Sequence, residues 1–290
     1  MKQIVIASGK GGTGKTTLSA SFAKLAGHSV MVDADVDAAD MFILMKPDKT
    51  VEEPFYGNEA ARFDPDLCTQ CGECVDVCRF GALSFDDNDM PSLDETACEG
   101  CSVCSHVCPT GALYMEPCDC GKSFVSETAC GTMVHARLGI AAENSGMLVT
   151  ELRKRAAEIA EEKGEDLIII DGPPGIGCPV MAAVTGADLI VCIAEPTVSG
   201  MHDLTRILDL ADHFGIQTKS IMNKIDINPE IAEKVKRDCE ARGSEIIAEI
   251  PYDSDVVQSI IAAKPLVDYS DGPASQAIKS AWEKVKSIVG

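Results

Sequence analysis

The sequence has little positive charge, no long apolar run and no leader-like N-terminus, and each absence excludes a class of protein. Among 290 residues, 25 Lys and Arg face 46 Asp and Glu, which gives a formal net charge of −21. Such a chain has no electrostatic grip on nucleic acid or on an anionic membrane. No stretch approaches the roughly 18 apolar residues of a membrane span, and the first apolar run is too short for a secretion signal. We therefore expect a cytoplasmic protein that binds neither nucleic acid nor membranes.

Cysteine, by contrast, is abundant, with 14 residues. In a cytoplasmic chain this indicates metal ligation before disulfide formation. The acidic charge is also unevenly spread, because residues 64–117 carry one basic side chain, Arg79, among many Asp and Glu. This segment is either solubilising or a docking face for a basic partner.

Apolar strand-like stretches alternate with amphipathic helical ones over most of the chain. Strands are expected at 2–8, 29–35, 166–171, 189–195, 219–224 and 245–251, and helices at 15–27, 145–163, from about 178, 200–214, 229–242, 254–263 and 274–288. The alternation predicts an α/β protein with a doubly wound, mostly parallel sheet. It stops over the cysteine-rich block. We expect 1–54 and 123–290 to form one domain, with 55–122 inserted as a small α+β domain.

The cysteine-rich block contains an internal repeat. Cys68, Cys71, Cys74 and Cys78 recur, shifted by 30 positions, as Cys98, Cys101, Cys104 and Cys108. Each copy reads C-x2-C-x2-C-x3-C. Its first three thiolates can bind one iron–sulfur cluster, while the fourth lies too far along the chain and binds the neighbouring cluster. One [4Fe–4S] cluster is thus expected on Cys68, Cys71, Cys74 and Cys108, and the other on Cys98, Cys101, Cys104 and Cys78. Zinc is the competing interpretation, but it typically takes separated cysteine pairs.

This block resembles the bacterial two-cluster ferredoxins over about fifty residues. It departs from them at Arg79, where a proline usually follows the fourth cysteine. Proline is not a ligand, so the resemblance still implies electron transfer through two [4Fe–4S] clusters.

A phosphate-binding loop follows the first predicted strand. Gly9, Gly14, Lys15 and Thr16 fit G-x-x-x-x-G-K-[ST] between a strand and a helix. Lys15 is expected to reach the β- and γ-phosphates, and the Thr16 hydroxyl to bind Mg²⁺. The residues expected to surround the nucleotide phosphates are Gly11, Gly12, Thr13, Gly14, Lys15, Thr16 and Thr17.

A second lysine, Lys10, stands early in this loop, which resembles the deviant Walker A motif of the MinD/Mrp/nitrogenase-iron-protein superfamily. The resemblance implies a nucleotide-dependent homodimer in which Lys10 reaches the nucleotide of the partner; a solvated loop lysine is the alternative. It also implies that Asp35, in "VDADVD", activates the attacking water, and that Asp171, in "IIIDGPPG", holds Mg²⁺ through water. Asp35 is expected near the same ion.

The base is less directly indicated. "NKID", beginning at Asn223, fits the guanine-reading N-K-x-D pattern, whereas the MinD-like resemblance implies that Asn223, with Pro251 and Asp253, frames adenine. We expect ATP and ADP rather than GTP.

Cys178 follows Asp171 at the offset of a cluster-binding cysteine in the nitrogenase iron protein. A third, dimer-bridging cluster is one interpretation, and a small buried cysteine at a helix start is the other. Cys118 and Cys120 either bind metal or pack in the protein, and Cys130 is left open between the same two roles.

The last helix places Ile278, Trp282, Val285 and Val289 on one face. MinD uses a C-terminal amphipathic helix on membranes, but here packing on the sheet is expected.

The leading hypothesis is therefore a Mg²⁺-dependent P-loop ATPase whose nucleotide-driven dimer closure is coupled to electron transfer. The electrons would pass to a redox partner or to a protein resembling nitrogenase-cofactor carriers. The alternatives are an Mrp-like carrier or assembly factor for metal clusters, and a MinD- or ParA-like positioning ATPase.

Overall fold

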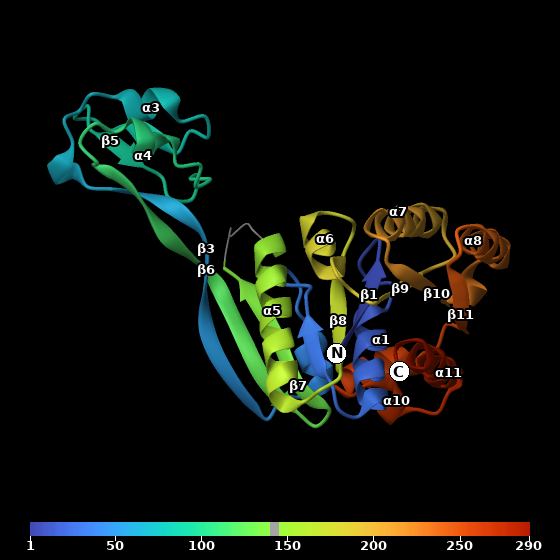
Figure 1. Ribbon diagram of the computed structural model, residues 1–290. Coiled ribbons are helices and arrows are strands. Elements are labelled where there is room, and N and C mark those ends of the chain that lie inside the picture. The colour runs from blue at the N-terminus through green and yellow to red at the C-terminus, as the bar shows by residue number, and fades with distance from the viewer. Residues whose placement is uncertain (140–144) are drawn as a thin grey trace. The chain divides into compact units, whose positions relative to one another are not determined.

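The computed structural model describes residues 1–139 and 145–290, and the chain divides into two compact units (Figure 1). The larger unit holds Met1–Glu53, Lys122–Arg137 and Ser145–Gly290, and the smaller one is built mainly from Pro54–Gly121.

The centre of the large unit is a parallel sheet. In the described part of the chain the sheet has nine strands in the order β11-β10-β9-β1-β8-β2-β7-β6-β3. β1 pairs in parallel with β8 and β9, β2 with β8 and β7, and β10 with β9 and β11. The strands are β1 (Lys2–Ser8), β2 (Val30–Asp33), β3 (Lys49–Phe63), β6 (Leu113–Thr128), β7 (Gly131–Leu138), β8 (Leu167–Pro174), β9 (Leu189–Ala194), β10 (Gln217–Asn223) and β11 (Glu245–Ile250). The predicted α/β class and mostly parallel sheet are confirmed.

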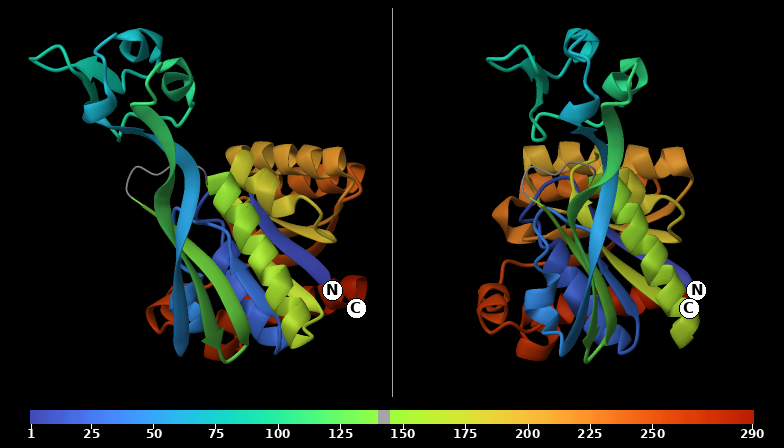
Figure 2. Two further views of the ribbon diagram at one scale, coloured as in Figure 1. Left: turned by 60° about the vertical axis from the view of Figure 1, so that its left-hand side comes forward. Right: turned by 90° about the vertical axis from the view of Figure 1, so that its left-hand side faces the viewer.

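Helices cover both faces of the sheet (Figures 1 and 2). They are α1 (Lys15–Ala26), α2 (Met41–Met45), α5 (Ser145–Lys163), α6 (Cys178–Val184), α7 (Val198–Phe214), α8 (Pro229–Ala241), α9 (Asp255–Ile261), α10 (Leu266–Tyr269) and α11 (Pro273–Val289). Ile4, Val5 and Ile6 of β1 are all fully buried because side chains on both faces of this strand meet helices.

The last helix packs inside the large unit. Ile278, Trp282 and Val285 are buried, and the Trp282 ring lies 5.2 Å from that of Phe22 on α1, centroid to centroid. The expected packing on the sheet is confirmed. Within the residues described, no helix combines the length and apolar character that a bilayer crossing requires.

Three strands lie where the sequence predicted an interruption of the α/β pattern. β3, β6 and β7 join the sheet beyond β2, and β3 and β6 continue from the large unit into the small one. Periodicity did not indicate β3 because it begins KTVEEPFYGN, which is polar and contains Pro54 and Gly57. The buried side chains of β3, Phe55, Ala60 and Ala61, come after the polar stretch KTVEE, which backbone pairing holds extended. Asp48 N, for example, donates to Glu127 O over 2.9 Å.

The small unit shows the 30-residue repeat as two similar local structures. α3 (Glu73–Val77) and α4 (Val103–Val107) each follow a residue in the left-handed region, Gly72 at φ 79° and Ser102 at φ 64°. Each helix ends at the fourth cysteine of its repeat. β4 (Leu83–Phe85) pairs antiparallel with β5 (Pro91–Leu93). Ala61, Leu83 and Leu113 form a small apolar core among the cysteines.

Candidate functional site

The phosphate-binding loop lies between β1 and α1, as its motif requires. Gly12 and Gly14 have φ of 76° and 98°, values that favour glycine. A Cβ on Gly14 would lie 2.7 Å from Asn223 Nδ2, and one on Gly9 would lie 2.0 Å from Cβ of Asp203. A Cβ on Gly11 or Gly12 would meet no heavy atom within 4 Å. The loop is thus packed on one side and open on the other, where phosphates could approach its backbone.

Lys15 is buried at the start of α1. Its Nζ donates to Ser8 Oγ over 3.0 Å, and Ser8 Oγ donates to the carbonyl oxygen of Lys10 over 2.7 Å. The buried Thr13 precedes it in the loop, and Thr16 and Thr17 lie in the first turn of α1. These hydrogen bonds therefore fix the position of the Lys15 ammonium group relative to the loop.

Asn223 and Asp253, which are expected to contact the nucleotide base, make hydrogen bonds within the protein. Asn223 Nδ2 donates to the carbonyl oxygen of Thr13 over 2.8 Å, so this side chain braces the phosphate loop. Asp253 accepts from the backbone N–H of Asp255 over 2.9 Å and of Ala274 over 3.3 Å. Pro251 follows β11 and is half-buried.

Two carboxylates lie side by side on adjacent strands near the loop. Asp33 on β2 is in register with Asp171 on β8, and both are buried. Ser19 Oγ donates to Asp171 Oδ1 over 2.9 Å, whereas Asp171 Oδ2 is buried without a hydrogen-bond partner among the described residues. Burial raises the pKa of Asp171 to about 6, against the opposing effects of Thr16, Lys15 and Ser19. An unpartnered, buried carboxylate oxygen beside the Thr16 hydroxyl is a donor set that suits Mg²⁺.

Asp35 and Asp33 have different roles. Asp33 accepts the backbone N–H of Met41 over 3.0 Å and of Asp35 over 3.2 Å, so it shapes the turn that leads into α2. Burial, followed by the proximity of Asp171, raises its pKa well above the usual value. Asp35 is half-buried; burial raises its pKa, and the charge on Lys15 lowers it. The negative charge of Asp35 also raises the pKa of Asp171, and the positive charge of Lys15 lowers the pKa of both.

Lys10 is held by an acidic residue that the sequence did not suggest. Its Nζ lies 3.1 Å from Glu195 Oε2, and Lys224 Nζ pairs with Glu195 Oε1. Lys224 Nζ also donates to the carbonyl oxygen of Gly12 over 3.3 Å. The sequence does contain one indication that Glu195 lies near the site. Glu195 follows a buried strand, and the carboxyl ends of parallel strands meet at the edge of the sheet where ligands bind.

Comparison with known proteins identifies the family of the chain. The model of the CobQ/CobB/MinD/ParA nucleotide-binding domain matches residues 4–266. The chain belongs to this family. An uncharacterized protein of Methanocaldococcus jannaschii is 35% identical over 293 residues, covering 99% of this chain and 97% of the relative.

Two solved structures share the fold of this MinD/ParA-family protein. The septum site-determining protein MinD of Pyrococcus horikoshii, complexed with Mg-ADP, has a TM-score of 0.60 at 20% identity and covers 100% of this chain and 97% of its own. MinD from the MinC:MinD complex of Aquifex aeolicus has a TM-score of 0.57 at 21% identity, over 99% and 96% of the two chains.

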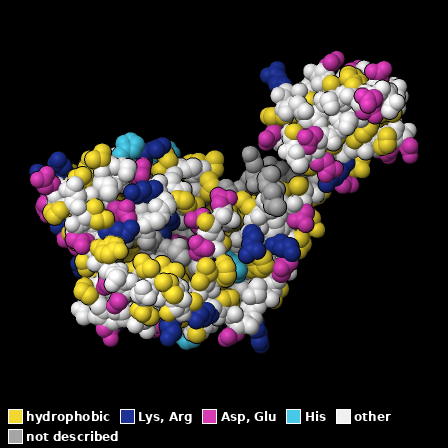
Figure 3. All heavy atoms as spheres, turned by 180° about the vertical axis from the view of Figure 1, so that it is seen from behind, with side chains coloured by type: hydrophobic (Ala, Val, Ile, Leu, Met, Phe, Trp, Pro, Cys, Tyr) yellow, Lys and Arg dark blue, Asp and Glu magenta, His cyan; other side chains and the backbone are white. Residues whose placement is uncertain are grey.

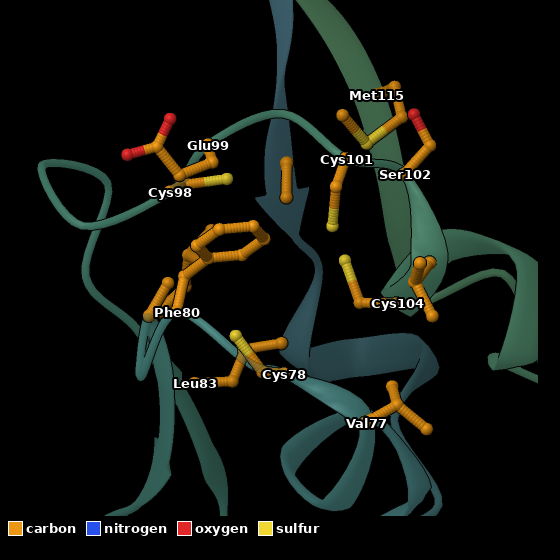
Figure 4. A pocket seen from close by; sticks show the side chains of 14 residues that line it. Val77, Cys78, Phe80, Leu83, Cys98, Glu99, Cys101, Ser102, Cys104 and Met115 are labelled. Atoms are coloured by element: carbon orange, nitrogen blue, oxygen red, sulfur yellow. The ribbon is translucent and has the colours of Figure 1, made fainter.

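In the small unit of this MinD/ParA-family protein, the cysteines line two cavities. One is lined by Cys78, Cys98, Cys101 and Cys104, whose sulfur atoms point into the same space (Figure 4). The other is lined by Cys68, Cys71, Cys74 and Cys108. Each cavity holds three cysteines of one repeat and the fourth of the other.

Equivalent cysteines of the two repeats have equivalent surroundings. Burial raises the pKa of the Cys74 and Cys104 thiols. Burial also acts on Cys78 and Cys108, but there the backbone N–H groups that follow each cysteine outweigh it and lower the pKa. Among the described residues no three His, Cys, Asp or Glu converge as they would around one metal ion.

Cys178 begins α6, as expected, but it is exposed, so its interpretation as a buried helix-start cysteine is wrong. Gly146 at the start of α5 packs closely against this residue, because a Cβ there would lie 3.3 Å from Cys178 Cβ. The remaining cysteines lie outside both cavities: Cys120, Cys130, Cys192 and Cys239 are buried and Cys118 is half-buried.

Proposed function

We propose that this protein is a Mg²⁺-dependent ATPase whose nucleotide-driven dimerisation is coupled to electron transfer through two [4Fe–4S] clusters. The observation that carries the proposal is the pair of four-cysteine cavities in a chain that also has a phosphate-binding loop. A nucleotide-binding family member has no need of these eight thiols for phosphate chemistry alone.

The nucleotide half of the proposal rests on the loop and the carboxylates near it. Bound Mg²⁺ supplies charge neutralisation for the phosphates. The Thr16 hydroxyl and Asp171 Oδ2 would hold this ion, Asp171 through water, and Lys15 would face the β- and γ-phosphates. Asp35, half-buried with a raised pKa, is suited to accept a proton from the attacking water. The complex of the Pyrococcus horikoshii relative with Mg-ADP supports this assignment.

ATP is the proposed nucleotide. Asn223 braces the loop through Thr13, and Asp226, the carboxylate of the guanine-reading N-K-x-D pattern, already accepts the backbone N–H of Tyr252 over 2.8 Å, so both motif residues are engaged within the protein. We propose that Asn223, Pro251 and Asp253 form the wall against which adenine packs. Competition of unlabelled GTP against labelled ATP tests this, and equal competition would contradict it.

The cysteine half rests on the shape of the donor sets. Ligands of one ion converge on a point, whereas thiolates of a [4Fe–4S] cluster bind different irons and stand apart. The sulfur atoms that surround the cavity in Figure 4 have the second arrangement. Backbone N–H groups around Cys78 and Cys108 lower the thiol pKa, which favours the thiolate that iron requires.

Iron analysis of protein prepared without oxygen tests this half. The wild type should carry about eight irons per chain. Cys98→Ser should lower the content by about half, because one cavity loses a ligand. Cys192→Ser is the matched control, since Cys192 is buried in β9 outside both cavities and should leave iron unchanged. Equal iron in wild type and Cys98→Ser would contradict the assignment.

Cys178 has a separate test. Its exposure at the start of α6 is compatible with a ligand shared across a dimer axis, as in the resemblance that suggested a third cluster. Cys178→Ala would then lower the iron content of the ATP-bound dimer below that of wild type. An iron content equal to that of wild type would contradict the third cluster and leave two clusters per chain.

Coupling of the two halves is tested by redox titration. A nucleotide that binds the reduced protein tenfold more tightly than the oxidised protein, or the reverse, shifts a one-electron potential by about 60 mV. We expect different cluster potentials with ATP analogue and with ADP. Identical potentials, with efficient transfer of clusters to an apo-protein, would favour the Mrp-like carrier instead. Identical potentials without transfer would favour a MinD-like positioning ATPase, the function named for several relatives.

A redox partner that docks on the small unit would be basic. Acidic side chains are scattered over the visible face of this unit (Figure 3), in keeping with the single basic residue, Arg79, of residues 64–117. Partner binding itself has a family precedent in the MinC:MinD complex. A captured protein that binds the acidic small unit and also accepts electrons from it would be identified as this partner.

A further inference from the structure

Glu195 is a largely buried acidic residue that pairs with Lys10 of the phosphate loop. It follows β9, with 10% of its side chain exposed, and its backbone is fixed at the start of α7. Thr197 N donates to its carbonyl oxygen over 2.8 Å, and a Cβ on Gly200 would lie 2.4 Å from that oxygen. The carboxylate is thus held at one place beside the loop.

Two lysines share this carboxylate, one on each oxygen. Lys10 Nζ lies 3.1 Å from Oε2, and Lys224 Nζ pairs with Oε1. Burial raises the pKa of Glu195, but Lys224 and Lys10 outweigh it and the net pKa is lowered. Glu195 therefore stays ionised although it is largely removed from water.

The two lysines are not held equally. Lys224 is also tied to the loop through the Gly12 carbonyl oxygen, and its backbone N–H donates to Asn223 Oδ1 over 2.9 Å. Lys10 Nζ has no second ion pair within the described residues, and 35% of its side chain is exposed. Lys10 is therefore the cation that can leave, and Lys224 would remain to neutralise the buried carboxylate when it does.

We propose that Glu195 is a positioning residue that retains Lys10 on its own chain until ATP-driven dimerisation draws this lysine to the partner's nucleotide. The inference rests on the proposed role of Lys10 in the dimer. Departure of Lys10 exchanges one ion pair for another, and Lys224 makes the exchange possible because Glu195 is never left as an unpaired buried charge. Glu195 thereby sets the ATP concentration at which two chains pair.

Sedimentation of the full chain with Mg²⁺ and a non-hydrolysable ATP analogue tests the proposal. Glu195→Gln releases Lys10 and should tighten the dimer about threefold to tenfold, as expected for a partly exposed ion pair. Lys224→Gln should weaken it, because Lys10 then becomes the sole counterion of Glu195. Glu245→Gln, which removes a carboxylate–lysine pair on β11, is the matched control and should have no effect.

Lys10→Ala separates this inference from the proposed function. If Lys10→Ala leaves analogue-dependent dimerisation intact, the proposed role of Lys10 in the dimer is wrong. If Lys10→Ala abolishes dimerisation and Glu195→Gln weakens it or leaves it unchanged, the role of Glu195 is wrong while the dimer role stands. In a Lys10→Ala background, Glu195→Gln should add nothing.

Discussion

Replacing Asp171 by Asn should stabilise the nucleotide-free protein while impairing Mg²⁺-dependent nucleotide binding. Asp171 is fully buried, and burial raises its pKa from 3.8 to about 6. Because the folded pKa is raised, the ionised carboxylate destabilises the fold; this penalty is absent below pH 3.8 and complete above pH 6. The shift corresponds to about 3 kcal/mol at neutral pH.

An asparagine removes this charge but not every polar requirement. Its oxygen can still accept from Ser19 Oγ, whereas its amide takes the place of the unpartnered Oδ2 and costs about 1 kcal/mol. The net gain is about 2 kcal/mol, or roughly 4–8 °C in the melting temperature of a unit of this size.

Thermal unfolding at pH 5 and pH 7.5, without nucleotide or Mg²⁺, measures this gain. The difference between Asp171→Asn and wild type should grow with pH. Asp188→Asn is a control of opposite sign: although burial raises the Asp188 pKa, bonds from Gln3 N and Lys2 lower it overall, so its loss should destabilise slightly. Mg-ADP should raise the melting temperature of wild type more than that of Asp171→Asn. A variant less stable than wild type at pH 7.5 would refute the reasoning.

Three further predictions follow from packing and burial. Gly14→Ala should abolish nucleotide binding in isothermal titration, because its Cβ would lie 2.7 Å from Asn223 Nδ2 at a φ of 98°. Gly27→Ala is the control, because Gly27 has a similar φ of 80° but its Cβ would meet nothing within 4 Å; equal affinities of the two variants would contradict this. Burial lowers the pKa of His135 to about 4, so the free energy of unfolding should fall by up to about 3 kcal/mol as the pH drops from 6.5 to 4. His135→Gln should reduce this pH dependence in denaturation experiments, and an unchanged dependence would contradict the prediction. Trp282→Ala should cost about 3–5 kcal/mol in denaturant unfolding because the ring packs on Phe22; a loss below 1 kcal/mol would mean that α11 is not part of the core.

His135 itself illustrates how a residue without a predicted function is explained by its surroundings. Its ring stacks between Phe42 and Phe124, with centroids 6.1 and 5.0 Å away, and its Nε2 lies 3.0 Å from Ser126 Oγ. These neighbours come from α2 and β6, and His135 itself lies in β7; the sequence predicted none of these elements. A structural role is sufficient for this histidine.

The sequence by itself determined the features that depend on local pattern. The alternating apolar and amphipathic stretches predicted the parallel sheet and the helix Ser145–Lys163, because burial on both faces of a strand demands apolar runs. The phosphate loop and the cysteine repeat were readable because glycine conformations and thiolate spacing are short-range requirements.

Only the tertiary structure decided which distant residues meet. Glu195 contacts Lys10, Asn223 braces Thr13, and Ser19 bonds Asp171 because carboxyl ends of parallel strands converge at one edge. The polar start of β3 is extended through backbone pairing, which leaves no periodic side-chain signal. The exposure of Cys178 likewise depends on how α5 and α6 pack, and packing between elements has no signature in a stretch of neighbouring residues.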